Sequence, residues 1–160
     1  MKDRIDEIRF SYSGISTFET CKHAWYLTYI KEEERLPNTW AEYGLLVHET
    51  LEKYFNGELE ASQLAKYYVD NWDKFVVTPP PPYIMKISEY KEQGLKFFEG
   101  FVFDKNNYNV ILIEGKVDIE YQGIKLVVKP DLILQDKETG RYYLLDYKSS
   151  LVWKKGKFDE

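Results

Sequence analysis

Cysteine is nearly absent from this chain of 160 residues, which carries only Cys21. A single thiol excludes an intramolecular disulfide framework and any zinc or iron–sulfur site built from this chain's cysteines alone. Long apolar runs are missing as well, since no window of about 18 apolar residues occurs and the N-terminus is charged. The sequence therefore predicts neither a membrane span nor a secretory signal, and we expect a cytoplasmic protein with no membrane partner.

An excess of basic charge is also lacking, because the formal net charge is −5. A basic coat of the kind that binds nucleic acid nonspecifically is excluded, so any contact with DNA must be local. Aromatic residues, in contrast, are abundant and make up 17% of the chain. Together with a hydrophobic content of 44%, this composition predicts one globular domain over residues 1–160.

Helical and strand patterns are segregated along the chain, with helices expected within 11–103 and a sheet within 108–150. Apolar spacing predicts four helices, over about 13–30, 40–55, 61–76 and 84–103, and the first is expected to be capped by Ser13. The fold class is therefore α/β, in α+β order. The four prolines at 79–82 favour polyproline II geometry, either as a stiff spacer or as a ligand for a proline-reading domain.

Three strands are predicted at the C-terminal end, over 109–121, 124–135 and 141–149, as an antiparallel meander. If Gln122-Gly123 is a two-residue turn, its register places Glu114 opposite Asp131. If the next loop spans 137–140, Asp131 in turn lies opposite Asp146.

The predicted registers set three carboxylates side by side on one face of the sheet, with Lys148 on the same face. Adjacent carboxylates repel one another unless a cation lies between them, and a divalent metal would serve. The alternative is that this face is the solvated side of an amphipathic sheet, where charges pair loosely. The apolar neighbours in the run 144–148 favour burial of Asp146 and Lys148, and hence the metal site.

The same residues resemble a known family. Pro130-Asp131, fourteen residues, and then Asp146-Tyr147-Lys148 reads as the PD-(D/E)XK pattern of metal-dependent nucleases. Upstream, the segment 10–30 and the G-x-x-x-H helix beginning at Gly44 are similar to the RecB-type branch, which includes the RecB and AddB nuclease domains and the CRISPR adaptation exonucleases. This resemblance covers about residues 10–150 and implies a restriction-endonuclease-like core with a helical N-terminal half.

The resemblance also implies a role for each site residue. The ligands of Mg²⁺ or Mn²⁺ would be His48, Asp131, Asp146 and the backbone carbonyl of Tyr147. Lys148 would position and activate the attacking water, and Glu114 would help to hold the metal shell. Outside the motif, His48 would be read as a core histidine on an apolar helix face.

Two departures from the branch stand out. Members with an iron–sulfur cluster have three further cysteines near the C-terminus, and this sequence has none of them. We therefore expect no iron–sulfur cluster on this chain, and we expect Cys21 to pack as a small hydrophobe. The branch also continues into a helix bearing Q-x-x-x-Y, whereas this sequence stops twelve residues after Lys148. We therefore expect either a minimal or clipped member or a chain completed by a larger protein. A short basic cluster near the C-terminus would either contact the DNA backbone or form a solvated tail; it consists of Lys154, Lys155 and Lys157.

The function expected from the resemblance is a metal-dependent deoxyribonuclease, an exonuclease in recombination, repair or phage DNA processing. DNA is the expected partner, with a helicase or recombination protein as a further one. The alternative is a nuclease-like module that no longer cuts and binds DNA or a helicase. A third possibility is an interaction domain that presents the proline-rich segment 78–83.

Overall fold

The computed structural model describes residues 10–34, 36–82 and 87–149. Contacts divide the chain into two compact units, one of Met1–Leu36 with Glu114–Pro130 and one of Pro37–Ile113 with Asp131–Glu160. The second unit carries the long helices and a three-stranded sheet, and the first carries short helices and a hairpin. A single nuclease-like domain over 1–160 stays a prediction.

The first unit begins with α2 (Tyr12–Thr20), which Ser11 caps by accepting the Gly14 N–H at 3.1 Å. The predicted cap, Ser13, is wrong because that residue already lies in the first turn of the helix. The predicted continuous helix also breaks at Cys21, whose backbone is extended. Cys21 instead caps α3 (Lys22–Trp25) through its sulfur and is exposed, so its expected packing as a hydrophobe is wrong. A π-helical turn, Tyr26–Ile30, follows directly.

A two-stranded hairpin completes this unit, formed by β2 (Val117–Tyr121) and β3 (Ile124–Val128). The strands pair from Val117 with Val128 to Tyr121 with Ile124. Gln122 and Gly123 both have positive φ, 52° and 76°, as a tight two-residue hairpin turn requires. The predicted turn and its register are therefore confirmed for this hairpin. Further along the predicted strands, a bulge between Val110 and Leu112 shifts the pairing by one residue, so the register predicted for the segment 108–110 is wrong.

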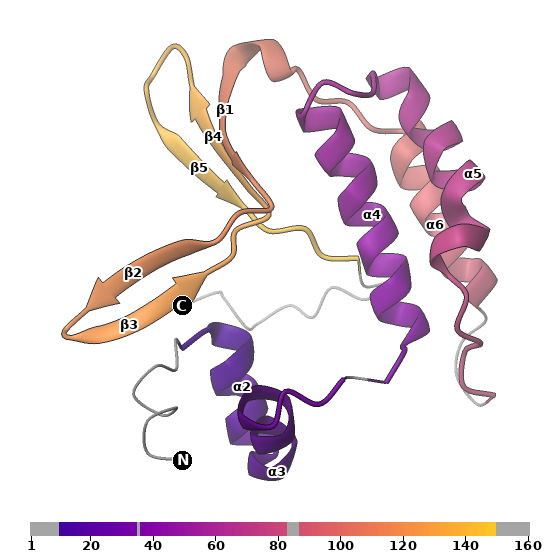
Figure 1. Ribbon diagram of the computed structural model, residues 1–160. Coiled ribbons are helices and arrows are strands. Elements are labelled where there is room, and N and C mark those ends of the chain that lie inside the picture. The colour runs from indigo at the N-terminus through magenta and orange to yellow at the C-terminus, as the bar shows by residue number, and fades with distance from the viewer. Residues whose placement is uncertain (1–9, 35, 83–86, 150–160) are drawn as a thin grey trace. The chain divides into compact units, whose positions relative to one another are not determined.

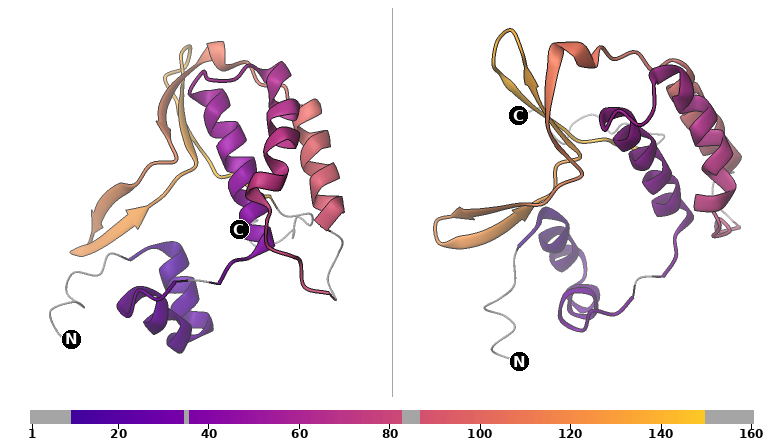
Figure 2. Two further views of the ribbon diagram at one scale, coloured as in Figure 1. Left: turned by 45° about the vertical axis from the view of Figure 1, so that its right-hand side comes forward. Right: turned by 45° about the horizontal axis from the view of Figure 1, so that its top comes forward.

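Three helices of the second unit lie side by side in Figures 1 and 2: α4 (Thr39–Phe55), α5 (Leu64–Phe75) and α6 (Ile87–Glu99). Asn38 caps α4 by accepting the Trp40 N–H at 2.8 Å, and a 3₁₀ turn, Ala61–Gln63, leads into α5. Among the described helices, none combines the length and apolarity needed to cross a membrane.

The sheet of the second unit consists of β1 (Tyr108–Ile113), β4 (Leu132–Asp136) and β5 (Tyr142–Leu145), in the antiparallel order β1-β4-β5. All three views place α4 between this sheet and α5. The buried core joins the helices to the central strand; its members are Tyr43, Leu46, Val47, Leu51, Tyr54, Phe55, Leu64, Tyr68, Trp72, Phe98, Leu132 and Leu134. The α/β class with a helical N-terminal half and a three-stranded antiparallel sheet is confirmed.

The first two predicted strands are each split in the structure, so the hairpin β2–β3 is separate from the sheet. Glu114 ends β1 because its φ of +46° is incompatible with an extended strand. Pro130 lies between β3 and β4 and lacks the N–H that a continued ladder needs. The two breaks fall directly beside the predicted site residues Glu114 and Asp131.

Candidate metal centre

His48 is held on α4 by its neighbours in the sequence. Val47 and Leu51 are buried against the core, which fixes the rotation of the helix about its axis. Glu49 strengthens this by accepting a hydrogen bond from the Tyr67 hydroxyl of α5 at 2.7 Å. Burial, with the Glu49 hydrogen bond, raises the pKa of Tyr67, so that this phenol remains a donor at neutral pH.

The two carboxylates near His48 take their places from neighbouring strands. Asp131 directly precedes β4, and Glu114 directly follows β1. The last pair of the ladder before these two residues joins Ile113 to Leu132, and the pairing of Glu114 with Asp131 stays a prediction. The peptide bond to Ile113 fixes where the Glu114 backbone lies at the end of β1.

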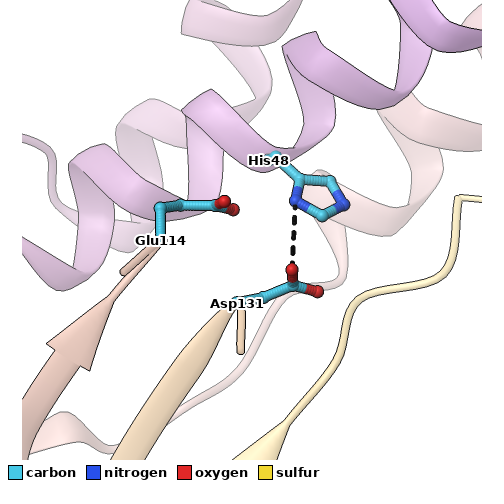
Figure 3. Close-up of side chains that lie close together, drawn as sticks. All are labelled: His48, Glu114 and Asp131. Atoms are coloured by element: carbon cyan, nitrogen blue, oxygen red, sulfur yellow. Dashed lines mark ion pairs between the residues drawn. The ribbon is translucent and has the colours of Figure 1, made fainter. Parts of the chain in front are cut away.

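These three side chains converge (Figure 3). The Nδ1 atom of His48 lies 3.7 Å from Oδ1 of Asp131. One ligand atom from each of His48, Glu114 and Asp131 lies within 4.8 Å of the others. A helix and two strand ends, which are far apart in sequence, thus supply one nitrogen and two carboxylates to a small volume.

Tyr147 organises the pair formed by His48 and Asp131. Its backbone N–H donates a hydrogen bond to Oδ2 of Asp131, which leaves Oδ1 directed at the histidine. Its ring packs edge-on against the imidazole, with centroids 5.6 Å apart. The sequence pattern predicts only a ligand role for the Tyr147 carbonyl, and this double support of both neighbours was missed. Side-chain alternation gave no signal for it, because the bond to Asp131 comes from the Tyr147 backbone and β5 ends at Leu145.

Asp146 and Lys148 form an ion pair with each other, and both side chains are about half exposed. The prediction that the apolar run 144–148 buries these charges is wrong, because Leu144 itself is 64% exposed at the end of an edge strand. Leu132 pairs with Leu145, so the predicted register, which would place Asp131 opposite Asp146, holds along β4 and β5. The Asp146 carboxylate nevertheless lies outside the group of His48, Glu114 and Asp131.

Comparison with known protein families finds a match to the PD-(D/E)XK nuclease superfamily over residues 9–157. The chain belongs to this superfamily. Comparison with curated proteins and with solved structures finds no match. Membership in the PD-(D/E)XK superfamily indicates a metal-dependent nuclease that acts on DNA.

The donor set fits the divalent cation that PD-(D/E)XK enzymes use. Carboxylate oxygens and an imidazole nitrogen bind such ions at about 2.0–2.5 Å, so two ligands of one ion lie at most about 4–5 Å apart. The 3.7 Å between His48 and Asp131 falls within this limit, and so does the whole group. These two atoms are too far apart for a direct hydrogen bond, which leaves room for a shared cation.

Gly44 of the G-x-x-x-H helix has a packing role that the PD-(D/E)XK pattern alone does not explain. A Cβ built at this position would lie 3.3 Å from Oγ of Ser149, one residue after the D-x-K segment. A side chain at position 44 would require the Ser149 side chain to shift slightly.

The three lysines predicted to contact the DNA backbone, Lys154, Lys155 and Lys157, fall outside the described residues.

Proposed function

We propose that this chain hydrolyses phosphodiester bonds of DNA with Mg²⁺ or Mn²⁺ held by His48, Asp131 and Glu114. The observation that carries the proposal is the convergence of these three side chains beside the D-x-K segment. Carboxylate oxygens favour Mg²⁺ and Mn²⁺ over softer metals. When bound, the ion would stabilise charge on the scissile phosphate and lower the pKa of a coordinated water.

Asp131 is the central ligand of the proposed site. It is 8% exposed, its Oδ2 accepts the Tyr147 N–H, and its Oδ1 lies 3.7 Å from Nδ1 of His48. A buried carboxylate is costly unless it is hydrogen-bonded and paired, so Asp131 is preorganised for a cation. Tyr147 holds the ligand in place, and its backbone carbonyl is proposed to join the metal shell.

Lys148 is proposed to orient the attacking water and to share its proton. Its ammonium group is a mobile point charge, half exposed and held by the carboxylate of Asp146. Asp146 is proposed to leave this pair and join the metal shell when the ion binds.

We further propose that the chain belongs to the RecB/AddB-like branch and acts as an exonuclease in recombination, repair or phage DNA processing. Support comes from the G-x-x-x-H helix. It supplies His48, which lies near Asp131, and Gly44, which lies close to Ser149 just after the D-x-K segment. A helicase or recombination protein is the proposed partner in this role, and Lys154, Lys155 and Lys157 are proposed contacts to the DNA backbone.

The test is cleavage of end-labelled single- and double-stranded DNA by the purified full chain, with Mg²⁺, with Mn²⁺ and with EDTA. We expect products with either metal, none with EDTA, and none from Asp131→Asn or His48→Ala. Asp73→Asn is a matched control, since this α5 carboxylate is 94% exposed and outside the site. Binding of DNA without cleavage by any metal would instead support the module that binds DNA without cutting it.

A further inference from the structure

A cavity of about 570 Å³ opens beside the Asp146–Lys148 ion pair, entirely within the second unit. Helix α4 supplies an apolar floor of Tyr43, Val47 and Leu51, all of them buried. Such a volume is typical of small-ligand sites, which combine apolar walls with a few polar groups.

Helix α6 forms the facing wall of this cavity with Gln93, Gly94, Lys96 and Phe97. Phe97 is 49% exposed, while the adjacent Phe98 is fully buried. The rings of Phe98 and Phe101 brace the Phe97 ring at centroid distances of 5.1 and 5.8 Å. The cavity therefore contains one partly exposed aromatic ring that its neighbours hold in place.

Gly94 keeps this wall close to the core. A Cβ at this position would lie 2.4 Å from the hydroxyl oxygen of Tyr68, which is fully buried and cannot move aside. Gln93 and Phe97, four residues apart on α6, both line the cavity on either side of this glycine in the sequence. An amide that can hydrogen-bond is thus placed one helical turn from an exposed ring.

We propose that this cavity receives one unpaired nucleotide of the DNA strand being cut, with its base stacked on Phe97 and its polar edge near Gln93. The inference rests on the proposed function, because Lys148 at the rim would hold the phosphate whose neighbouring nucleoside then enters the cavity. Every base offers a π-face, so stacking on an aromatic ring is tolerant of sequence. A base paired within a duplex cannot enter a concave site of this size, so the strand must be unpaired here.

The positive charge at the rim agrees with this occupant. Lys96 and Lys148 both line the cavity, and each is paired with a half- or mostly exposed carboxylate on the surface, Glu92 and Asp146. Exposed ion pairs of this kind are weak, so a phosphate can compete for either ammonium group. An apolar segment of another protein would gain nothing from these two lysines.

The experiment measures binding and cleavage separately on the full chain. Single-stranded oligonucleotides with one 2-aminopurine are titrated in EDTA, where stacking on an aromatic ring quenches the fluorescence. Wild type, Phe97→Ala and Phe97→Trp are compared with Leu45→Ala, an exposed α4 residue that does not line the cavity. Thermal melting establishes that each variant is folded.

We expect Phe97→Ala to weaken binding of single-stranded DNA about 5- to 100-fold and to abolish quenching, the range for loss of one stacked base. Phe97→Trp should retain both, Leu45→Ala should behave as wild type, and in cleavage assays Phe97→Ala should raise KM more than it lowers kcat. Unchanged affinity of folded Phe97→Ala, or an equal loss on blunt duplex, would overturn the inference. Phe97-dependent quenching by a chain that cuts no DNA with either metal would support a nucleotide site in this cavity but contradict the proposed nuclease function.

Discussion

Substitution of Asp131 by asparagine and by alanine should separate the charge of this side chain from its hydrogen bond. The carboxylate accepts the Tyr147 N–H and faces the His48 imidazole at 3.7 Å. Asparagine keeps an acceptor oxygen of the same shape without the negative charge. Alanine removes both the acceptor and the charge.

The expected magnitudes follow from the burial of this residue, which is 8% exposed. Alanine leaves the Tyr147 N–H without its acceptor, which lowers the free energy of unfolding by about 1–3 kcal/mol. Asparagine keeps that bond, and loss of the charge also relieves repulsion from Glu114, so the change should stay below about 1 kcal/mol. Both variants lose a metal ligand, and each should weaken metal binding by at least about 100-fold.

The assays are denaturant unfolding in EDTA and Mn²⁺ titration by calorimetry, with Asp73→Asn as the control for an exposed carboxylate. We expect alanine to be clearly less stable than asparagine, while both fail to bind the ion. Equal stability of the two variants would refute the hydrogen-bond argument. Metal affinity of Asp131→Asn close to that of wild type would refute the ligand assignment.

Three further predictions concern the neighbours of the site and its scaffold. Lys148→Ala should still bind Mn²⁺ in calorimetry but lose DNA cleavage by about 10²-fold or more, because its role lies with the water and phosphate; loss of metal binding would contradict this role. Gly94→Ala should lower the free energy of unfolding by about 1–3 kcal/mol, because its Cβ would overlap the buried Tyr68. Gly100→Ala, which meets only ordinary contacts, should be near neutral in the same denaturation experiment. The pKa of Tyr67 is higher in the folded than in the unfolded chain, so on raising the pH the phenol ionises in the unfolded state at a lower pH than in the folded state. The contribution of Tyr67 to the free energy of unfolding is therefore present below about pH 10 and is lost as the pH rises further. Tyr67→Phe should therefore flatten the fall in stability above pH 10 in denaturation curves, and an unchanged slope would exclude Tyr67 as its source.

Much of the fold was predictable because the decisive signals were local. The apolar stripe of α4 and the turn residues Gln122-Gly123 each act within a few residues, and both predictions are confirmed. The loop at 137–140 likewise sets the register of β4 and β5, with Asp136 accepting the N–H groups of Glu138 and Thr139. The turn at Gln122-Gly123 predicted Glu114 near Asp131, and each of these residues has a ligand atom in the group with His48.

The rest depended on backbone conformation and tertiary exposure, which side-chain patterns do not encode. The positive φ of Glu114 splits a strand that the apolar alternation continues through. Asp146 follows Tyr142 and Leu144, which are themselves 65% and 64% exposed, so apolar neighbours in the sequence did not bury it. The support that Tyr147 gives to both His48 and Asp131 arises only when α4 and the sheet pack together.

The most direct measurement of the central claim is a crystal structure of the full chain with Mn²⁺, using anomalous scattering to locate the ion. The account predicts a single strong peak about 2.0–2.5 Å from a nitrogen of His48 and an oxygen of Asp131, with Glu114 or Asp146 completing the shell. The peak should vanish in Asp131→Asn. A fully bound ion elsewhere on the chain, with His48 and Asp131 unliganded, would contradict the account.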